Sequence, residues 1–138
     1  MKGMARPLVV RREGTTAAEP RADLTITLDD YSYALSAPIS AGRRTLRVEN
    51  AARQIHELVL VRLAPGKSPH DLLAWMAKPE GPPPGAPIGG TSMFAPGVVN
   101  FVTADFTPGE YALLCFAPDA GDGKPHVEHG MVRQIHVD

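Results

Sequence analysis

Short hydrophobic runs, separated by glycine and proline at close intervals, make up most of the chain. Leucine or isoleucine alternates with threonine over residues 24–28, and this period of two is typical of a strand with one buried face. Residues 46–49 alternate in the same way. Residues 54–63 (QIHELVLVRL) are rich in branched side chains, which indicates a central strand buried on both faces. Further candidate strands cover residues 31–35, 98–106, 110–116 and 131–137.

One helix is predicted to interrupt these strands. Ser68 is a favourable N-cap, Pro69 suits the first helical position, and Asp71 stands where a capping box needs an acid. Two leucines, a tryptophan and a methionine within residues 72–76 then form an apolar helical stripe. The helix is expected to end near Lys78.

Turn-forming residues separate the predicted elements. The 14 prolines and 13 glycines favour turns and strand edges over long helices. Residues 79–85 (PEGPPPG) can be neither helix nor central strand, so they are expected to cross the surface. Turns are predicted at residues 41–42 and 107–109, and at the glycine pair 89–90. Short strands with one helical insertion indicate a Greek-key sandwich or barrel.

The chain is long enough for one such domain and too short for two, because it has 138 residues. We assign residues 23–138 to the domain and residues 1–22 to an N-terminal strand and linker. Residues 3–10 can be aligned with residues 130–137, with matching Gly, Met, Arg and final Val. We interpret this segment as the last strand of a preceding, similar repeat, with chance similarity over so short a stretch as the alternative.

Charge and hydropathy disfavour several classes of partner. The 14 basic residues nearly balance the 15 acidic ones, which leaves a formal net charge of −1. Neither nucleic acid nor an anionic membrane surface is therefore expected as the main partner. No apolar run approaches the length of a transmembrane helix, and the N-terminus lacks the apolar region of a secretory signal. We expect either a cytosolic protein or a processed piece of an exported one.

A set of soft metal ligands is the main chemical signal. Cys115 is the only cysteine, so it cannot form an intrachain disulfide. His126 and Met131 follow it in one predicted loop between strands, and His56 lies in the predicted buried strand. A thiolate, two imidazoles and a thioether suit both Cu(I) and Cu(II), so one copper ion in a blue-copper arrangement is the expected cofactor. His129 is the alternative second imidazole, although its closeness to Met131 leaves little room.

Other chemistry has less support. No glycine-rich loop links a strand to a helix to hold phosphate, and no serine stands in a nucleophile elbow. A hydrolase built on Cys115 is disfavoured, because a strand lacks the helix N-terminus that activates catalytic thiols. Multicopper enzymes need further His clusters, and this chain has five His. The chain alone is therefore not expected to be an enzyme.

Two motifs resemble the cupredoxin family, which includes plastocyanin, azurin and the type 1 domain of nitrite reductases. The first is residues 108–115 (PGEYALLC), followed by His126 and the Gly-Met pair 130–131. The second is residues 48–50 (VEN), which lead to His56. The resemblance covers roughly residues 23–138. It implies an all-β, Greek-key β-sandwich with one short helix in a long Pro/Gly-rich insertion.

The resemblance also implies a site and a function. His56, Cys115 and His126 match the equatorial copper ligands of the family, and Met131 matches the axial one. Cupredoxins pass electrons to protein partners outside the cytoplasm. The chain is therefore expected to be an electron-transfer protein with a redox protein partner, in the periplasm or otherwise extracytoplasmic. The neighbours of His126 are apolar, so its ring edge is expected to emerge in a patch where the partner docks.

Two features depart from the family pattern. Ten residues separate Cys115 from His126, a longer loop than in the small soluble carriers. Glu57 follows His56, where many members have an amide or hydroxyl side chain. Its carboxylate could hydrogen-bond a ligand imidazole, lower the reduction potential, or bind the metal itself.

Each candidate also has a purely structural interpretation. Cys115 can be an inert buried thiol, His56 a core histidine, and Met131 a space-filling side chain, while His126 and His129 can be loop residues. The remaining histidines, 70 and 136, are expected to be structural or surface residues. The alternative functions are copper trafficking or sequestration, and a metal-free cupredoxin-fold interaction module.

Overall fold

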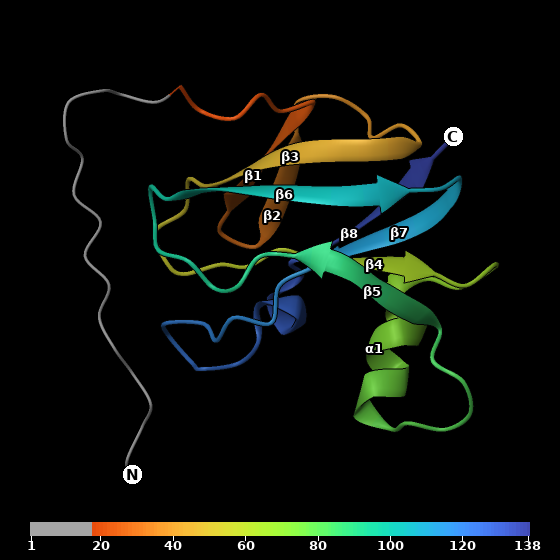
Figure 1. The fold of residues 1–138 in the computed structure, drawn as a ribbon. Helices are drawn as coiled ribbons and strands as arrows, with labels where there is room; N and C mark the ends of the chain where they lie inside the picture. The colour runs from red at the N-terminus through yellow and green to blue at the C-terminus, as the bar shows by residue number, and fades with distance from the viewer. Residues whose placement is uncertain (1–17) are drawn as a thin grey trace, which may run out of the picture.

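The computed structural model describes residues 18–138, which form two four-stranded sheets packed against each other (Figure 1). The first sheet contains β1 (Leu24–Asp29), β2 (Ser32–Leu35), β3 (Gly42–Asn50) and β6 (Val99–Phe106), in the order β2-β1-β3-β6. The second contains β4 (Val59–Leu63), β5 (Gly85–Gly90), β7 (Gly109–Leu114) and β8 (Val132–Val137), in the order β5-β4-β7-β8. One helix, α1 (Pro69–Ala77), follows β4. The expected all-β sandwich with a single helical insertion is confirmed.

The first sheet contains the predicted alternation of buried and more exposed side chains along β1. Leu24, Ile26 and Leu28 of β1 are buried, while the threonines between them are half-buried. Strand β1 pairs with β3 in parallel, and β3 pairs with β6 in antiparallel register. The parallel pair is possible because the chain leaves β1 for the edge strand β2 before it returns as β3.

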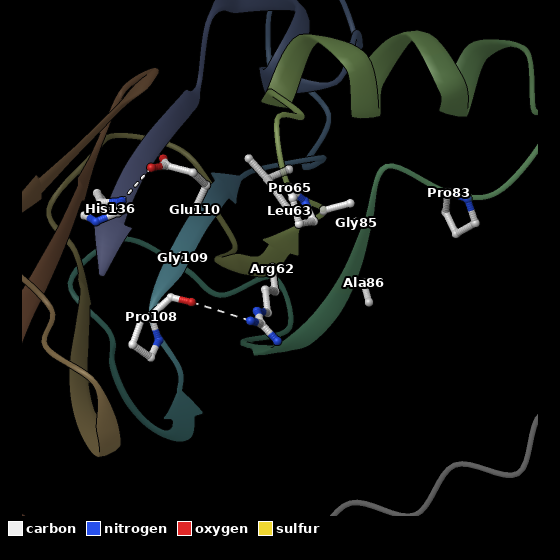
Figure 2. Close-up of a pocket in the computed structure, with 11 residues that line it drawn as sticks. Arg62, Leu63, Pro65, Pro83, Gly85, Ala86, Pro108, Gly109, Glu110 and His136 are labelled. Carbon is white, nitrogen blue, oxygen red and sulfur yellow. Dashed lines mark hydrogen bonds and ion pairs between the residues drawn. The ribbon is translucent and has the colours of Figure 1, made fainter. Parts of the chain in front are cut away.

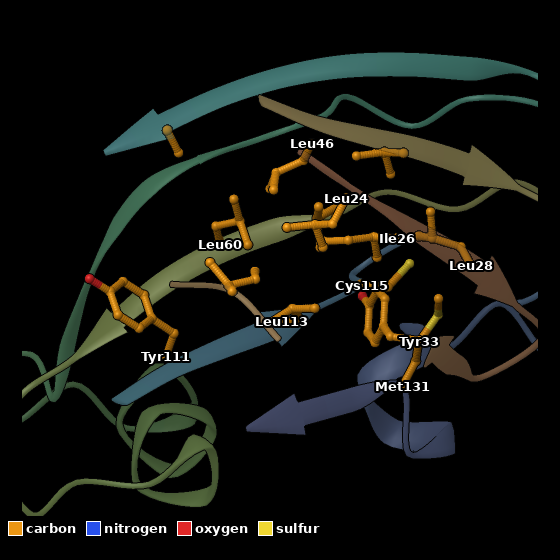
Figure 3. Close-up of a cluster of buried hydrophobic side chains, with 14 of the residues drawn as sticks. Leu24, Ile26, Leu28, Tyr33, Leu46, Leu60, Tyr111, Leu113, Cys115 and Met131 are labelled. Atoms are coloured by element: carbon orange, nitrogen blue, oxygen red, sulfur yellow. The ribbon is translucent and has the colours of Figure 1, made fainter. Parts of the chain in front are cut away.

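The hydrophobic core lies between the sheets. Figure 3 shows side chains from both sheets meeting there, with Tyr111 at one end and the sulfur atoms of Cys115 and Met131 at the other. Fully buried members of this cluster include Ile26, Leu28, Leu46, Val48, Leu60 and Leu113. Burial of this apolar surface is the main source of stability. The side chains of Cys115 and Met131 pack within the same cluster.

The predicted strand over residues 54–63 is shorter than expected. Pairing with β7 begins only at Val59, and His56 lies before the strand in a segment that forms an isolated bridge with Phe94. His56 and Leu58 are completely buried although they precede the strand, whereas Ile55 between β3 and β4 is exposed. Within β4, burial on both faces is confirmed: Leu60 faces the core between the sheets, and Val61 packs in a second cluster.

The glycine pair 89–90 is not a turn but the end of the edge strand β5. A Cβ added at Gly90 would lie 1.9 Å from the carbonyl oxygen of Leu58, so only glycine allows the two backbones to approach this closely. Pro87 is tolerated because β5 lies at the edge of the sheet. Of residues 79–85, predicted to cross the surface, 79–83 are exposed and form neither helix nor strand, whereas Pro84 is buried and Gly85 begins the edge strand β5.

Helix α1 begins as the sequence indicated. The Ser68 side chain accepts a hydrogen bond from the Asp71 N–H at 3.2 Å, and the Asp71 carboxylate accepts one from the Ser68 N–H at 2.8 Å. The Ser68 hydroxyl also donates to the Asp71 carboxylate at 2.6 Å, and this bond, followed by the one from the Ser68 N–H, holds the pKa of Asp71 below its usual value. Leu72 is the part of the apolar stripe that is buried, against Val61 and Leu63 of β4, whereas Met76 is exposed.

Tyr111 fixes the tight connection between β6 and β7. Its side chain is completely buried, and its hydroxyl donates to the Thr107 carbonyl at 2.8 Å and accepts from the Thr107 N–H at 3.0 Å. The turn predicted over residues 107–109 is confirmed by this junction.

Replacing Tyr111 by phenylalanine is expected to lower the free energy of unfolding by about 1–3 kcal/mol, because two backbone groups of Thr107 lose a partner. Urea unfolding measures the change. Thr107→Ala is the control: it removes only a side-chain contact at 3.4 Å, and a shift within about 0.5 kcal/mol is expected. Equal stability of Tyr111→Phe and the wild type would contradict this role.

Two further predictions concern the N-terminal segment and membrane-spanning helices. The predicted strand over residues 3–10 lies outside the described residues, so it stays a prediction, as does the domain boundary at residue 23. Among the helices of residues 18–138, none is long and apolar enough to cross a membrane.

Candidate metal centre

Three potential metal ligands meet at one end of the sandwich. Cys115 Sγ lies 3.7 Å from His56 Nδ1 and 3.4 Å from His126 Nδ1. The two imidazole centroids are 4.5 Å apart. One ligand atom from each residue lies within 4.8 Å of the others, and all three side chains are completely buried. The structure thus brings together three of the four residues singled out from the sequence as a compact His-Cys-His group.

The loop between β7 and β8 carries two of these residues. Cys115 follows directly after β7, which ends earlier than predicted, and His126 begins a 3₁₀ helix, His126–His129. The backbone folds back onto the strand end through bonds from the His126 N–H to the Ala117 carbonyl and from the Val127 N–H to the Cys115 carbonyl, both 2.9 Å. Figure 1 shows this loop in dark blue at one end of the sandwich.

Asn50 organises the segment that carries His56. This asparagine is completely buried, and its amide group donates to the carbonyls of Gln54 and Phe94, each at 2.9 Å. Its side-chain oxygen accepts from the Ala52 N–H at 3.0 Å. Phe94 also pairs with the His56 backbone, with bonds of 2.9 and 3.3 Å. One side chain therefore joins the two segments that hold the imidazole.

Glu57 braces the cysteine rather than an imidazole. Its backbone N–H donates to Cys115 Sγ at 3.4 Å, and its carboxylate accepts from the Phe116 N–H at 2.9 Å. Among the described residues, the carboxylate makes no hydrogen bond to the imidazole of His56 or of His126, and Glu57 is not part of the compact His-Cys-His group. Of the three roles considered for this carboxylate, the hydrogen bond to a ligand imidazole is not the one that the structure shows; its Oε1 accepts from the Phe116 backbone instead.

Met131 lies close to this group along the chain and in the core. It is completely buried in the same cluster as Cys115, and its N–H donates to the His126 carbonyl at 2.9 Å. Figure 3 shows its sulfur at the same end of the core as the cysteine sulfur. A role as axial ligand stays a prediction.

The other histidines lie outside the compact group. His129 is partly exposed, and its Nε2 lies 3.1 Å from an Asp122 carboxylate oxygen. His70 and His136 are exposed, as expected. The Glu110 carboxylate, 2.6 Å from His136 Nδ1, raises the pKa of His136 above its usual value.

Carboxylates face the outer nitrogen of both buried rings. His56 Nε2 lies 3.3 Å from Asp30 Oδ1, and His126 Nε2 lies 3.7 Å from Asp119 Oδ2. Each ring therefore turns its Nδ1 toward the sulfur and its Nε2 toward an acid, an arrangement that fixes ligand imidazoles at metal sites. Sequence reasoning did not identify Asp30 for this role, because it lies far from His56 in sequence and carries no motif.

The His126 ring does not emerge at the surface, contrary to expectation. It is completely buried, and its Nε2 has no hydrogen-bond partner in the described structure. The long loop places Asp119 over the outer edge of this ring. The long loop thus covers the His126 imidazole, which the sequence had predicted to be exposed at the surface.

Burial shifts the pKa values of Cys115 and His126 in opposite directions. Burial raises the pKa of the Cys115 thiol, although the backbone N–H groups of Glu57 and Ala117 oppose this effect. Burial, followed by the neighbouring His56, lowers the pKa of His126. A buried sulfur that accepts N–H bonds beside two imidazoles is a donor set that fits copper, so the residues present fit the expected metal.

A separate hollow of about 510 Å³ lies elsewhere on the surface, and its lining includes no member of the His-Cys-His group. Figure 2 shows Arg62 facing Pro108 across it, with Glu110 and His136 beside them. The hollow is open to solvent and plays no part in the metal centre.

The fold is cupredoxin-like, as the similarity to solved structures shows. Among solved structures, dithionite-reduced auracyanin of Roseiflexus castenholzii has 23% identity and a TM-score of 0.56, over 83% of this chain and 94% of its own. Auracyanin B has 18% identity and a TM-score of 0.54, over 91% and 96%. Auracyanin A, a blue copper protein of Chloroflexus aurantiacus, has 16% identity and a TM-score of 0.51, over 83% and 99%. No protein-family model and no curated protein matches the chain.

Proposed function

We propose that this chain binds one copper ion and transfers electrons. His56, Cys115 and His126 would hold the ion, with Met131 as a weaker axial ligand. The observation that carries the proposal is the buried His-Cys-His group, whose donor atoms lie within 4.8 Å of one another. The likeness to a blue copper protein supports the same metal.

The residues around the sulfur suit an electron carrier. The Glu57 N–H donates to Cys115 Sγ and so stabilises negative charge on the sulfur. The Glu57 carboxylate and the Phe116 N–H hold the chain on the other side of the cysteine. When bound, copper would supply one-electron chemistry by alternating between Cu(I) and Cu(II). Ligands fixed in this way need little rearrangement between the two states, which favours electron transfer over catalysis.

The partner and location follow as parts of the proposal. A one-electron carrier needs a redox protein as donor and another as acceptor, and we infer an extracytoplasmic location from the resemblance to cupredoxins. A preceding cupredoxin-like repeat would add a second domain to the protein.

Titration of the purified, metal-free protein with Cu(II) tests the proposal. We expect a strong visible absorption band from thiolate-to-copper charge transfer, saturating at one copper per chain and bleaching reversibly with dithionite. Tight Cu(I) binding without a coloured Cu(II) form would instead indicate trafficking. Absence of bound copper after reconstitution would favour a metal-free interaction module and refute the proposal.

A further inference from the structure

Three side chains from distant segments meet over the outer side of His126. The Tyr31 hydroxyl donates to an Asp119 carboxylate oxygen. The Gln54 side-chain amide donates to the same oxygen at 3.1 Å and lies 3.3 Å from the Tyr31 hydroxyl. The Ala120 N–H donates a hydrogen bond of 2.9 Å to the Gln54 side-chain oxygen. We call Tyr31, Gln54 and Asp119 the cap.

The cap accounts for the complete burial of His126. The Tyr31 ring packs edge-on against the imidazole, with centroids 5.5 Å apart and planes at 86°. The Asp119 side chain is 9% exposed, and its Oδ2 lies 3.7 Å from His126 Nε2. The hydrogen bond from Tyr31 holds the pKa of Asp119 far below its usual range. The Asp119 carboxylate therefore faces a buried ring nitrogen that makes no hydrogen bond in the described structure.

Tyr31 has an unfavourable backbone conformation, which the position of its side chain in the cap would explain. Tyr31 has φ of 63°, which is the only positive value for a non-glycine residue in the described chain. Glycine or asparagine is usual in this region, because a Cβ is strained there. The same turn between β1 and β2 also places Asp30 beside His56 Nε2. One turn thus contributes a side chain over each imidazole.

We propose that the cap seals the metal centre on its His126 side, limits the access of metal ions and small reagents to Cys115, and positions the His126 ring. Tyr31, Gln54 and Asp119 are positioning residues that act through His126. The part of this inference that concerns copper rests on the proposed function. The part that concerns access to the buried thiol does not, because it applies to the metal-free protein as well.

Tyr31→Phe and Asp119→Asn test the cap. Phenylalanine removes one hydroxyl and keeps the ring. Asparagine keeps an oxygen for the bonds that Asp119 accepts from the Gly121 and Asp122 N–H groups, but replaces the oxygen that Tyr31 and Gln54 share. Asp122→Asn is the matched control: it lies in the same loop, and its carboxylate faces His129 rather than His126.

The first measurement is the rate at which iodoacetamide alkylates Cys115 in the native, metal-free proteins. We expect both cap variants to react about tenfold faster than the control, since each loses a hydrogen bond that holds the cap closed. The second is the rate at which excess EDTA removes Cu(II), expected to rise by a similar factor. Because His126 would be less well positioned, the charge-transfer band is also expected to shift in Asp119→Asn and not in Asp122→Asn.

The outcomes separate the two proposals. Alkylation of both cap variants at the control rate overturns the cap, whatever the metal result. A colourless wild type with faster alkylation of the cap variants supports the cap as a seal and refutes the copper function. Urea unfolding of each metal-free variant shows whether it folds. If Asp119→Asn does not fold, the Tyr31→Phe rates alone decide.

Discussion

Replacing Cys115 by serine is expected to abolish the charge-transfer band and to weaken Cu(II) binding by at least about a hundredfold. Loss of an outer hydrogen-bond partner of a metal ligand already costs about 10–100-fold in affinity, and this change removes the sulfur that faces both His56 Nδ1 and His126 Nδ1. Absorption spectra and competition with a chelator of known affinity measure both effects.

His129→Gln is the matched control for this prediction. It removes an imidazole that lies in the same loop but outside the His-Cys-His group. Its band and copper affinity are expected to equal those of the wild type. An unchanged band in Cys115→Ser, or loss of colour in His129→Gln, would show that a different set of residues holds the metal.

Asn50→Ala is expected to lower the free energy of unfolding by about 3 kcal/mol and also to weaken copper binding. Two buried backbone groups and one partly buried group would lose their partner, and each buried group costs about 1–3 kcal/mol, although the costs are not fully additive. These groups belong to Ala52, Gln54 and Phe94 and hold the segment around His56. Urea unfolding and a copper titration of the same preparation measure the two effects.

The other asparagine provides the control. Asn100 lies on β6 and is only partly buried, and its side chain makes no hydrogen bond in the described structure. Asn100→Ala is expected to change the free energy of unfolding by less than about 0.5 kcal/mol. If Asn50→Ala unfolded at the same urea concentration as Asn100→Ala, the proposed organisation of the His56 segment would be wrong.

The fold could be predicted where side-chain alternation and turn chemistry agreed. Leu24, Ile26 and Leu28 identified β1, and Ser68 with Asp71 identified the start of α1. The prediction failed where burial had another cause. His56 and Leu58 are buried outside any strand, and no local period in the sequence reveals this kind of burial. The glycine pair 89–90 permits close contact between strands rather than a turn, a requirement that only the paired backbone shows.

The site was predictable to the extent that its chemistry is rare. A lone cysteine with histidine and methionine in one loop points to a soft metal, and three of the four residues form the compact group. The residues around them could not be predicted. Tyr31 and Asp119 are common residue types 88 positions apart, and only the folded loop brings them together. Glu57 was noticed, but its carboxylate proved to hold the Phe116 backbone.

X-ray absorption at the copper K edge, on protein loaded with one equivalent of Cu(II), tests the metal centre most directly. The scattering analysis should give one short copper–sulfur path and two imidazole nitrogens, and the sulfur path should disappear in Cys115→Ser. A coordination sphere of oxygen and nitrogen alone in the wild type would contradict the assignment of a cysteine-ligated copper site.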